Sequence, residues 1–168
     1  MTQMNEKDAR AVVDELLRRA GWDPKDGRYV GIEVPIAGGS SRVAEAGVAY
    51  RVGRTNIASH DNGAGQGRAD YVLWDGRGNA LAIIEAKGGS IDPYTAKQQA
   101  LHYARQLGAP FIFLTNGSLI YFWDYGDDDA RIVDSFFSRR DLERLVAMRA
   151  ERRPLATVPI PEHYIRQS

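Results

Sequence analysis

The chain has 168 residues, 43% of them hydrophobic and 26% charged, which is ordinary for a single globular domain with a hydrophobic core. It contains no cysteine, which excludes disulfides, thiolate metal sites and a cysteine nucleophile, and is compatible with a reducing compartment. The 22 basic and 22 acidic side chains cancel, so the chain lacks the strong net positive charge that usually marks nucleic-acid binding, although a local basic face is still allowed.

The chain opens with the polar segment MTQMNEKDAR, which is not typical of a signal peptide, and its apolar runs are too short to cross a bilayer. We therefore expect a cytoplasmic protein with no membrane segment. Residues 5–20 place alanine, valine and leucine at helical spacing, with Asn5 as N-cap and Gly21 as the stop, which predicts an amphipathic helix. Residues 28–36 predict a short strand, and residues 43–67 predict a strand or a loop with a glycine-rich end.

Arginines outnumber acidic residues between positions 40 and 68, where the chain carries Arg42, Arg51, Arg54 and Arg68. This segment is interpreted either as a local basic face or as a solvated loop. The acidic turn formed by Asp124 and residues 127–129 lies elsewhere in the chain.

The second half of the chain predicts two hairpins and two helices. The predicted elements are strands at 69–75 and 80–87, a helix at 93–108 that ends at Gly108, strands at 110–117 and 118–125, and a helix at 138–154. The short connections require antiparallel hairpins, whereas the helix at 93–108 is long enough to join parallel strands. This order predicts an α/β fold with a mixed β-sheet flanked by helices. Residues 1–153 are expected to form one domain and 154–168 a linker or tail.

The hairpin at 69–87 places three polar side chains at one end of a sheet face. If the turn centres on Arg77 and Gly78, cross-strand partners sum to 155, so Val72 lies opposite Ile83, Trp74 opposite Leu81, and Asp70 opposite Glu85. Side chains alternate along a strand, so Lys87 points the same way as Glu85. Val72, Trp74, Leu81 and Ile83 are expected to continue this row.

Two carboxylates at this separation repel each other unless a cation lies between them. Mg²⁺ favours oxygen ligands and is commonly held by one or two protein carboxylates. Lys87 is then placed to act on a metal-bound water or to neutralise charge on a phosphate. The alternative is a surface hairpin with an ordinary Glu and Lys, but the Glu-Ala-Lys segment follows the apolar run LAII, where charges are normally excluded.

These residues resemble a known nuclease family. The sequences RAD and IIEAK resemble the PD-(D/E)XK superfamily, with Asp70, Glu85 and Lys87 at the metal-binding and catalytic positions. The ordered set NEKDARAVVDELLRRAGW, GRADYVLW, AIIEAK and QQALHYARQLGAPFIFLTNGSLIYFWD resembles the N-terminal nuclease domain of the type I restriction endonuclease R (motor) subunit, over roughly residues 5–125. Ala69 stands where the superfamily's name-giving proline precedes the aspartate.

The resemblance implies roles for further residues. It implies a restriction-endonuclease-like core, an Ala86 carbonyl that helps Asp70 and Glu85 hold Mg²⁺ (or Mn²⁺), and a Gln-x-x-x-Tyr element at Gln99 and Tyr103 that positions DNA or the catalytic groups. The alternative interpretation is structural: Gln99 and Tyr103 lie on the flank of the helix and cap the core.

The first helix offers an additional acid. Glu6 is the candidate metal ligand, with an ion pair to Arg10 as the alternative, and Glu15 is a weaker candidate. Arg68 is a candidate phosphate contact, and His60 is either close to the scissile phosphate or a solvent-exposed loop residue. His102 and His163 are interpreted as surface residues.

The expected function is that of a Mg²⁺-dependent endonuclease domain acting on double-stranded DNA. In type I systems the partners are a specificity subunit and a methyltransferase subunit, and ATP acts through a downstream helicase, whose GK[ST] phosphate loop this chain lacks. The chain is therefore expected to be an isolated domain or a stand-alone relative of the same superfamily. A non-catalytic DNA-binding or assembly module that keeps the nuclease fold is the rival hypothesis.

Overall fold

The computed structural model describes residues 6–36 and 67–152. Along the chain, helices alternate with groups of strands, as expected for an α/β fold. The elements are α1 (Glu6–Arg19), β1 (Val30–Pro35), β2 (Arg68–Trp74), β3 (Ala80–Ala86), the 3₁₀ helix η1 (Pro93–Ala96), α3 (Lys97–Leu107), β4 (Phe111–Thr115), β5 (Ile120–Asp124), β6 (Arg131–Val133) and α4 (Arg139–Glu151).

The strands form one six-stranded mixed sheet in the order β1-β2-β3-β4-β5-β6. Only the central pair β3 and β4 is parallel, and every other neighbouring pair is antiparallel. The predicted helix at 93–108 joins this parallel pair, as α3 preceded by η1. Asp92 caps η1 by accepting a hydrogen bond from the Tyr94 N–H, and Gly108 ends α3 with a left-handed φ of 69°. The predicted crossover is therefore confirmed.

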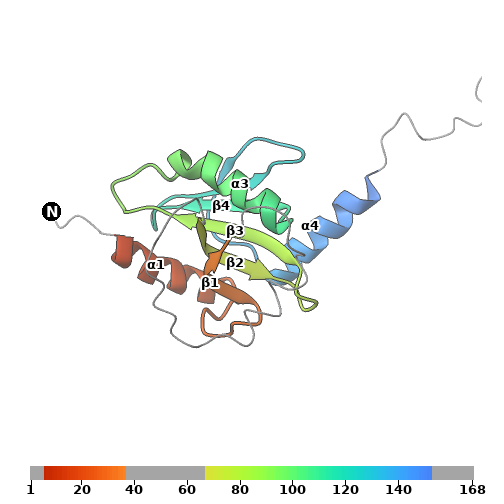
Figure 1. Cartoon of the computed structure of the whole chain (residues 1–168), viewed down its shortest axis with the longest axis horizontal. Coiled ribbons are helices and arrows are strands. Elements are labelled where there is room, and N and C mark those ends of the chain that lie inside the picture. Colours follow the sequence, from red (N-terminus) through yellow and green to blue (C-terminus); the bar gives the residue numbers. More distant parts are fainter. Residues whose placement is uncertain (1–5, 37–66, 153–168) are drawn as a thin grey trace, which may run out of the picture.

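Helices cover both faces of the sheet (Figure 1). The first core lies between the sheet and the helices α1 and α4; its members include Val13, Leu17, Tyr71, Leu73, Ile84, Phe113, Phe122 and Leu142. The second core lies under α3; its members include Val72, Trp74, Ile83, Ala100, Tyr103, Ala104, Ile112 and Leu114. Strands β3 and β4 are buried along their whole lengths because both faces are covered, which explains the continuous apolar runs in their sequences.

The register of the β2–β3 hairpin follows the prediction except next to the turn. Tyr71 pairs with Ile84, Val72 with Ile83 and Leu73 with Ala82, so these partners do sum to 155. The prediction that Trp74 lies opposite Leu81 is wrong, because Trp74 pairs with Ala80.

A bulge at this step explains the error. The turn is closed by the Asp75 N–H, which donates to the Asn79 carbonyl, and Gly78 takes a left-handed φ of 88°. Leu81 is therefore an extra residue on β3 and packs in the first core, opposite the face occupied by Val72 and Ile83. The bulge confines the irregularity to the turn end, so the polar end of the hairpin keeps its predicted alignment.

The C-terminal part adds one strand that the sequence pattern did not predict. β6 has three residues and pairs antiparallel with β5 at the edge of the sheet. The predicted β4–β5 hairpin is confirmed, with Gly117 at a φ of 89° in its turn. Across the described ranges, no helix is both long enough and apolar enough to span a membrane.

Candidate active site

Asp70 and Glu85 lie side by side on β2 and β3, and each contacts the other's strand. The Ala86 N–H donates to Asp70 Oδ2 at 2.8 Å, and the Asp70 N–H donates to Glu85 Oε1 at 3.4 Å. Each carboxylate thus accepts a hydrogen bond from a backbone N–H of the neighbouring strand. The contacts hold both carboxylates at the same end of the hairpin, as the predicted register requires.

Glu85 is a carboxyl group inside a hydrophobic sheet. It is 2% exposed and stands next to Leu114 of the parallel strand β4. Burial raises the pKa of Glu85 to about 8, and the negative charge of Asp70 adds to this shift. The hydrogen bond from Asp70 and the positive charges of Lys87 and Arg10 act in the opposite direction on this pKa. A carboxyl group with this pKa carries a proton at neutral pH unless a cation offsets the cost of its charge.

Arg10 of α1 brings a positive charge to this pair, which the sequence pattern did not predict. Its Nη2 lies 2.8 Å from Asp70 Oδ1, and its Nη1 lies 2.6 Å from Glu33 Oε1. Glu33 falls between the β1–β2 pairs of Ile32 and Val34, and its backbone has a φ of 51°. Left-handed backbone is uncommon for a residue other than glycine and costs free energy. Arg10 therefore bridges a carboxylate of the site and a carboxylate on a strained position of β1.

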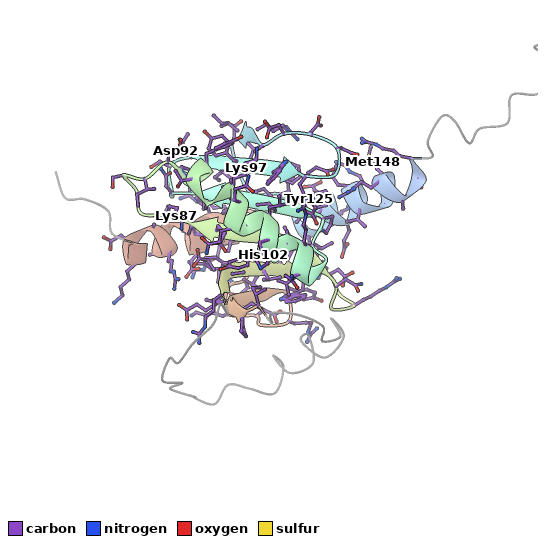
Figure 2. All side chains as sticks on the ribbon, turned by 45° about the horizontal axis from the view of Figure 1, so that its top comes forward. Lys87, Asp92, Lys97, His102, Tyr125 and Met148 are labelled. Carbon is purple, nitrogen blue, oxygen red and sulfur yellow. The ribbon has the colours of Figure 1, made fainter. Side chains whose placement is uncertain are left out.

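Lys87 follows directly after β3, where the strand leaves the sheet. Its N–H donates to the Thr115 carbonyl of β4 at 2.8 Å, which continues the parallel ladder by one residue. Alternation along the strand places the half-buried Lys87 side chain on the same face as Glu85. Figure 2 shows Lys87 at the end of β3, where the chain turns toward α3.

The predicted pair on α3 is also brought together. Gln99 Nε2 donates to the Tyr103 hydroxyl at 3.0 Å, so the two side chains share one face of the helix. Gln99 is exposed, whereas Tyr103 is buried in the second core. Tyr103 lies so close to Gly67, just before β2, that a Cβ on this glycine would stand 2.0 Å from the Tyr103 hydroxyl oxygen. The ring of Tyr103 thus connects α3 to the beginning of the strand that carries Asp70.

The remaining predicted residues are less closely tied to the carboxylates. Arg68 is exposed, and its Nη1 lies 3.9 Å from Glu33 Oε2. Glu15 pairs with Arg18 and Arg19 on the surface of its own helix. His102 is exposed, as expected, and its ring lies 6.0 Å from that of Tyr103.

Several predicted residues fall outside the part of the chain that the structure describes. Glu6 begins α1, but its side chain is not among the described ones. His60 and His163 lie outside the described residues, as do Arg42, Arg51 and Arg54 of the basic segment.

The oxygen donors of this site suit a hard divalent cation. Asp70 and Glu85 supply two adjacent carboxylates, and both are more than four-fifths buried, with side-chain exposure of 12% for Asp70 and residue exposure of 2% for Glu85. Mg²⁺ commonly binds to one or two protein carboxylates and keeps several waters. Among residues 6–36 and 67–152 no group of three or more His, Cys, Asp or Glu side chains gathers as a metal site. The fit therefore depends on the two carboxylates, with backbone carbonyls and water as the other donors.

Comparisons with known proteins agree on one family. Residues 54–136 match the family model described as type I restriction enzyme R protein N terminus. This range contains Asp70, Glu85, Lys87, Gln99 and Tyr103.

The curated relatives are much longer than this chain. The chain is 45% identical over 56 residues to the type I restriction enzyme EcoAI endonuclease subunit of Escherichia coli, an alignment that covers 33% of this chain and 7% of that protein. It is 31% identical over 104 residues to the EcoKI endonuclease subunit of Escherichia coli strain K12, covering 61% of this chain and 8% of that protein.

A solved structure shares the fold. It is a fragment assigned to the HsdR subunit of a type I restriction enzyme from Vibrio vulnificus YJ016, with a TM-score of 0.67 and 25% identity, covering 88% of this chain and 26% of that one. The family model, the two curated relatives and the solved structure therefore agree that this chain is similar to the N-terminal region of type I restriction enzyme R proteins.

Proposed function

We propose that this chain is a Mg²⁺-dependent nuclease domain that hydrolyses phosphodiester bonds of double-stranded DNA in the cytoplasm, as part of a type I restriction system. The observation that carries the proposal is the buried pair Asp70 and Glu85, held side by side across β2 and β3 with Lys87 at the end of β3. Buried adjacent carboxylates oppose folding, so their presence in a hydrophobic sheet calls for a function.

Each residue of the site has a distinct proposed role. Asp70 and Glu85 hold the metal ion together with the Ala86 carbonyl, and Glu6 at the start of α1 is a further candidate ligand. Bound there, Mg²⁺ (or Mn²⁺) supplies a Lewis acid for the scissile phosphate and a more acidic water. Lys87 orients the attacking water or neutralises charge that develops on the phosphate.

The residues on α3 and β2 position the DNA. Tyr103 is fixed by packing in the second core and against Gly67, so Gln99, its hydrogen-bonded neighbour, has a defined place on the exposed surface. Arg68 is exposed at the start of β2 and is proposed to contact a phosphate. Such contacts do not read sequence, so the choice of site is assigned to a specificity subunit and a methyltransferase subunit. ATP would act through a helicase region outside this chain.

A non-catalytic DNA-binding or assembly module is the second candidate. The observation in its favour is that the described residues gather two carboxylates and no third His, Cys, Asp or Glu side chain. Arg10 also supplies Asp70 with a positive charge without a metal ion. A domain of this kind would keep the fold and its contacts without cleaving DNA.

Metal binding measured by calorimetry separates the two candidates. We expect the wild type to bind Mn²⁺, and Asp70→Asn and Glu85→Gln to abolish binding and plasmid nicking together. Lys87→Met should keep metal binding and lose nicking, because Lys87 acts on the water or phosphate. Glu15→Gln, which removes an exposed carboxylate of α1, is the matched control and should behave as the wild type. No metal binding by the wild type, with or without DNA, would exclude the nuclease proposal and favour the module.

A further inference from the structure

Arg10 contacts the Asp70 carboxylate directly. Asp70 has two carboxylate oxygens, and both already accept hydrogen bonds: Oδ2 from the Ala86 N–H and Oδ1 from Arg10 Nη2. The backbone donor belongs to the sheet and is fixed. The guanidinium belongs to a side chain that is 32% exposed, so Oδ1 is the oxygen that can change its partner.

Glu33 gives Arg10 a second partner. Arg10 Nη1 lies 2.6 Å from Glu33 Oε1, while the other terminal nitrogen, Nη2, contacts Asp70. A guanidinium presents several N–H donors in a planar fork, so it can serve two carboxylates at once. If Arg10 leaves Asp70, it stays paired with Glu33, and its charge does not become an isolated one.

We propose that Arg10 is a built-in counter-ion of the carboxylate pair, which competes with a divalent cation for Asp70 Oδ1 and is retained by Glu33 when the cation binds. This inference rests on the proposed function, since the competing cation is the metal of the nuclease site. Arg10 is a positioning residue: it keeps Asp70 in place and its charge balanced in the metal-free domain. Neither Arg10 nor Glu33 lies in residues 54–136, the range that the family model covers.

Removal of Arg10 should therefore strengthen metal binding. We expect Arg10→Met, which keeps the length of the side chain without its charge, to lower the Kd for Mn²⁺ about tenfold in calorimetry at pH 8, because no hydrogen bond to a charged partner has to be broken. Arg18→Met is the matched control: it removes an equal charge from the same helix, and the ion-pair partner of Arg18 is the exposed Glu15. Its Kd should stay within about twofold of the wild type, and any change should vanish in high salt. The effect of Arg10→Met should persist in high salt.

Glu33 supplies a second, independent test. Glu33→Gln removes the retaining partner and keeps the contact between Arg10 and Asp70, so the Kd for Mn²⁺ should rise about threefold or more. Glu33 is 47% exposed, and this variant is expected to fold even if Arg10→Met does not. In the double variant Arg10→Met/Glu33→Gln the effect of Glu33→Gln should disappear, whereas a general loss of negative charge would weaken binding in both backgrounds.

The outcomes distinguish this inference from the proposed function. A Kd that is the same in the wild type and Arg10→Met, or a Glu33→Gln effect that persists without Arg10, overturns the role of Arg10 and leaves the nuclease proposal intact. The absence of Mn²⁺ binding in the wild type and in every variant overturns both. Tighter binding by Arg10→Met but not by Arg18→Met supports both.

Discussion

At the scale of single residues, the burial of Glu85 makes the stability of the metal-free folded state depend on pH. Its pKa is raised from 4.5 to about 8, chiefly by burial. Below pH 4.5 the group is protonated in the folded and the unfolded chain and has no effect on stability. Between pH 4.5 and about 8 the unfolded chain loses this proton while the folded chain keeps it, so the metal-free folded state loses stability as the pH rises. Above about pH 8 both states are ionised and the loss of stability has reached its full value.

Glu85→Gln should remove this pH dependence. We expect the variant and the wild type to have similar free energies of unfolding at pH 4, and the variant to be more stable by about 5 kcal/mol at pH 9 without metal. Urea denaturation at the two pH values measures the difference. Glu15→Gln changes an exposed carboxylate and should show no such divergence. A variant that is no more stable than the wild type at pH 9 would mean that Glu85 is not buried as described.

Gly67 limits the space next to Tyr103. A Cβ at this position would lie 2.0 Å from the Tyr103 hydroxyl and 2.5 Å from two ring carbons, so Gly67→Ala must displace a buried ring. We expect a loss of about 1–3 kcal/mol in the free energy of unfolding, typical of overpacking, together with loss of the ordered position of Gln99. Gly76→Ala is the matched control, because nothing lies within 4 Å of the Cβ it would add. Equal denaturation midpoints for the two variants would show that Tyr103 moves aside freely.

At the scale of elements, α1 is joined to β2 by a partly buried polar contact. The Tyr71 hydroxyl donates to Asp14 Oδ1 at 2.9 Å and lies 3.3 Å from the Arg10 carbonyl. Burial and the hydrogen bond to Asp14 raise the pKa of Tyr71, which keeps it a proton donor. This contact fixes the turn of α1 that also carries Arg10.

Tyr71→Phe should therefore loosen α1. We expect it to lower the free energy of unfolding by about 1–2 kcal/mol, because Asp14 loses its buried donor. Asp14→Ala should cost a similar amount, and the double variant should cost less than the sum of the two. Thermal denaturation of this cycle measures the coupling, and strictly additive effects would contradict the contact.

The sequence predicted the elements whose pattern is local and long. Helices α1, α3 and α4 follow from periodic apolar residues, and the alignment of Asp70 with Glu85 follows from the length of the turn and the period of a strand. The bulge at Leu81 was not predicted, because apolar residues on a strand buried on both faces do not show which face each occupies. β6 was missed because three residues with two exposed side chains give no pattern.

The part of the site that the sequence did not predict depends on contacts between distant segments. Arg10 lies 23 residues from Glu33 and 60 from Asp70 in the chain, and helical periodicity explains it equally well as a surface residue. Glu33 adopts a left-handed backbone without being glycine, so its sequence gives no sign of that conformation. Only the three-dimensional arrangement of α1, β1 and β2 brings the three charges together.

At the scale of the whole molecule, a metal ion that binds only the folded state should stabilise all of it. The chain has no net charge, so addition of a cation does little to long-range repulsion, and the effect should come from the site. At a metal concentration ten times the Kd, the gain in the free energy of unfolding is about 1.4 kcal/mol. For a domain of this size such a gain corresponds to a rise in Tm of about 3–6 °C.

Differential scanning calorimetry with Mn²⁺ at pH 8 measures this rise. The metal must displace the Glu85 proton below its pKa of about 8, so the rise should shrink steadily as the pH falls toward 6 at the same metal concentration. Glu85→Gln should show no rise at either pH, while Glu15→Gln should reproduce the wild type. A rise that is equal at both pH values, or that survives in Glu85→Gln, would place the metal away from the Asp70 and Glu85 pair, because binding elsewhere would not be linked to this proton.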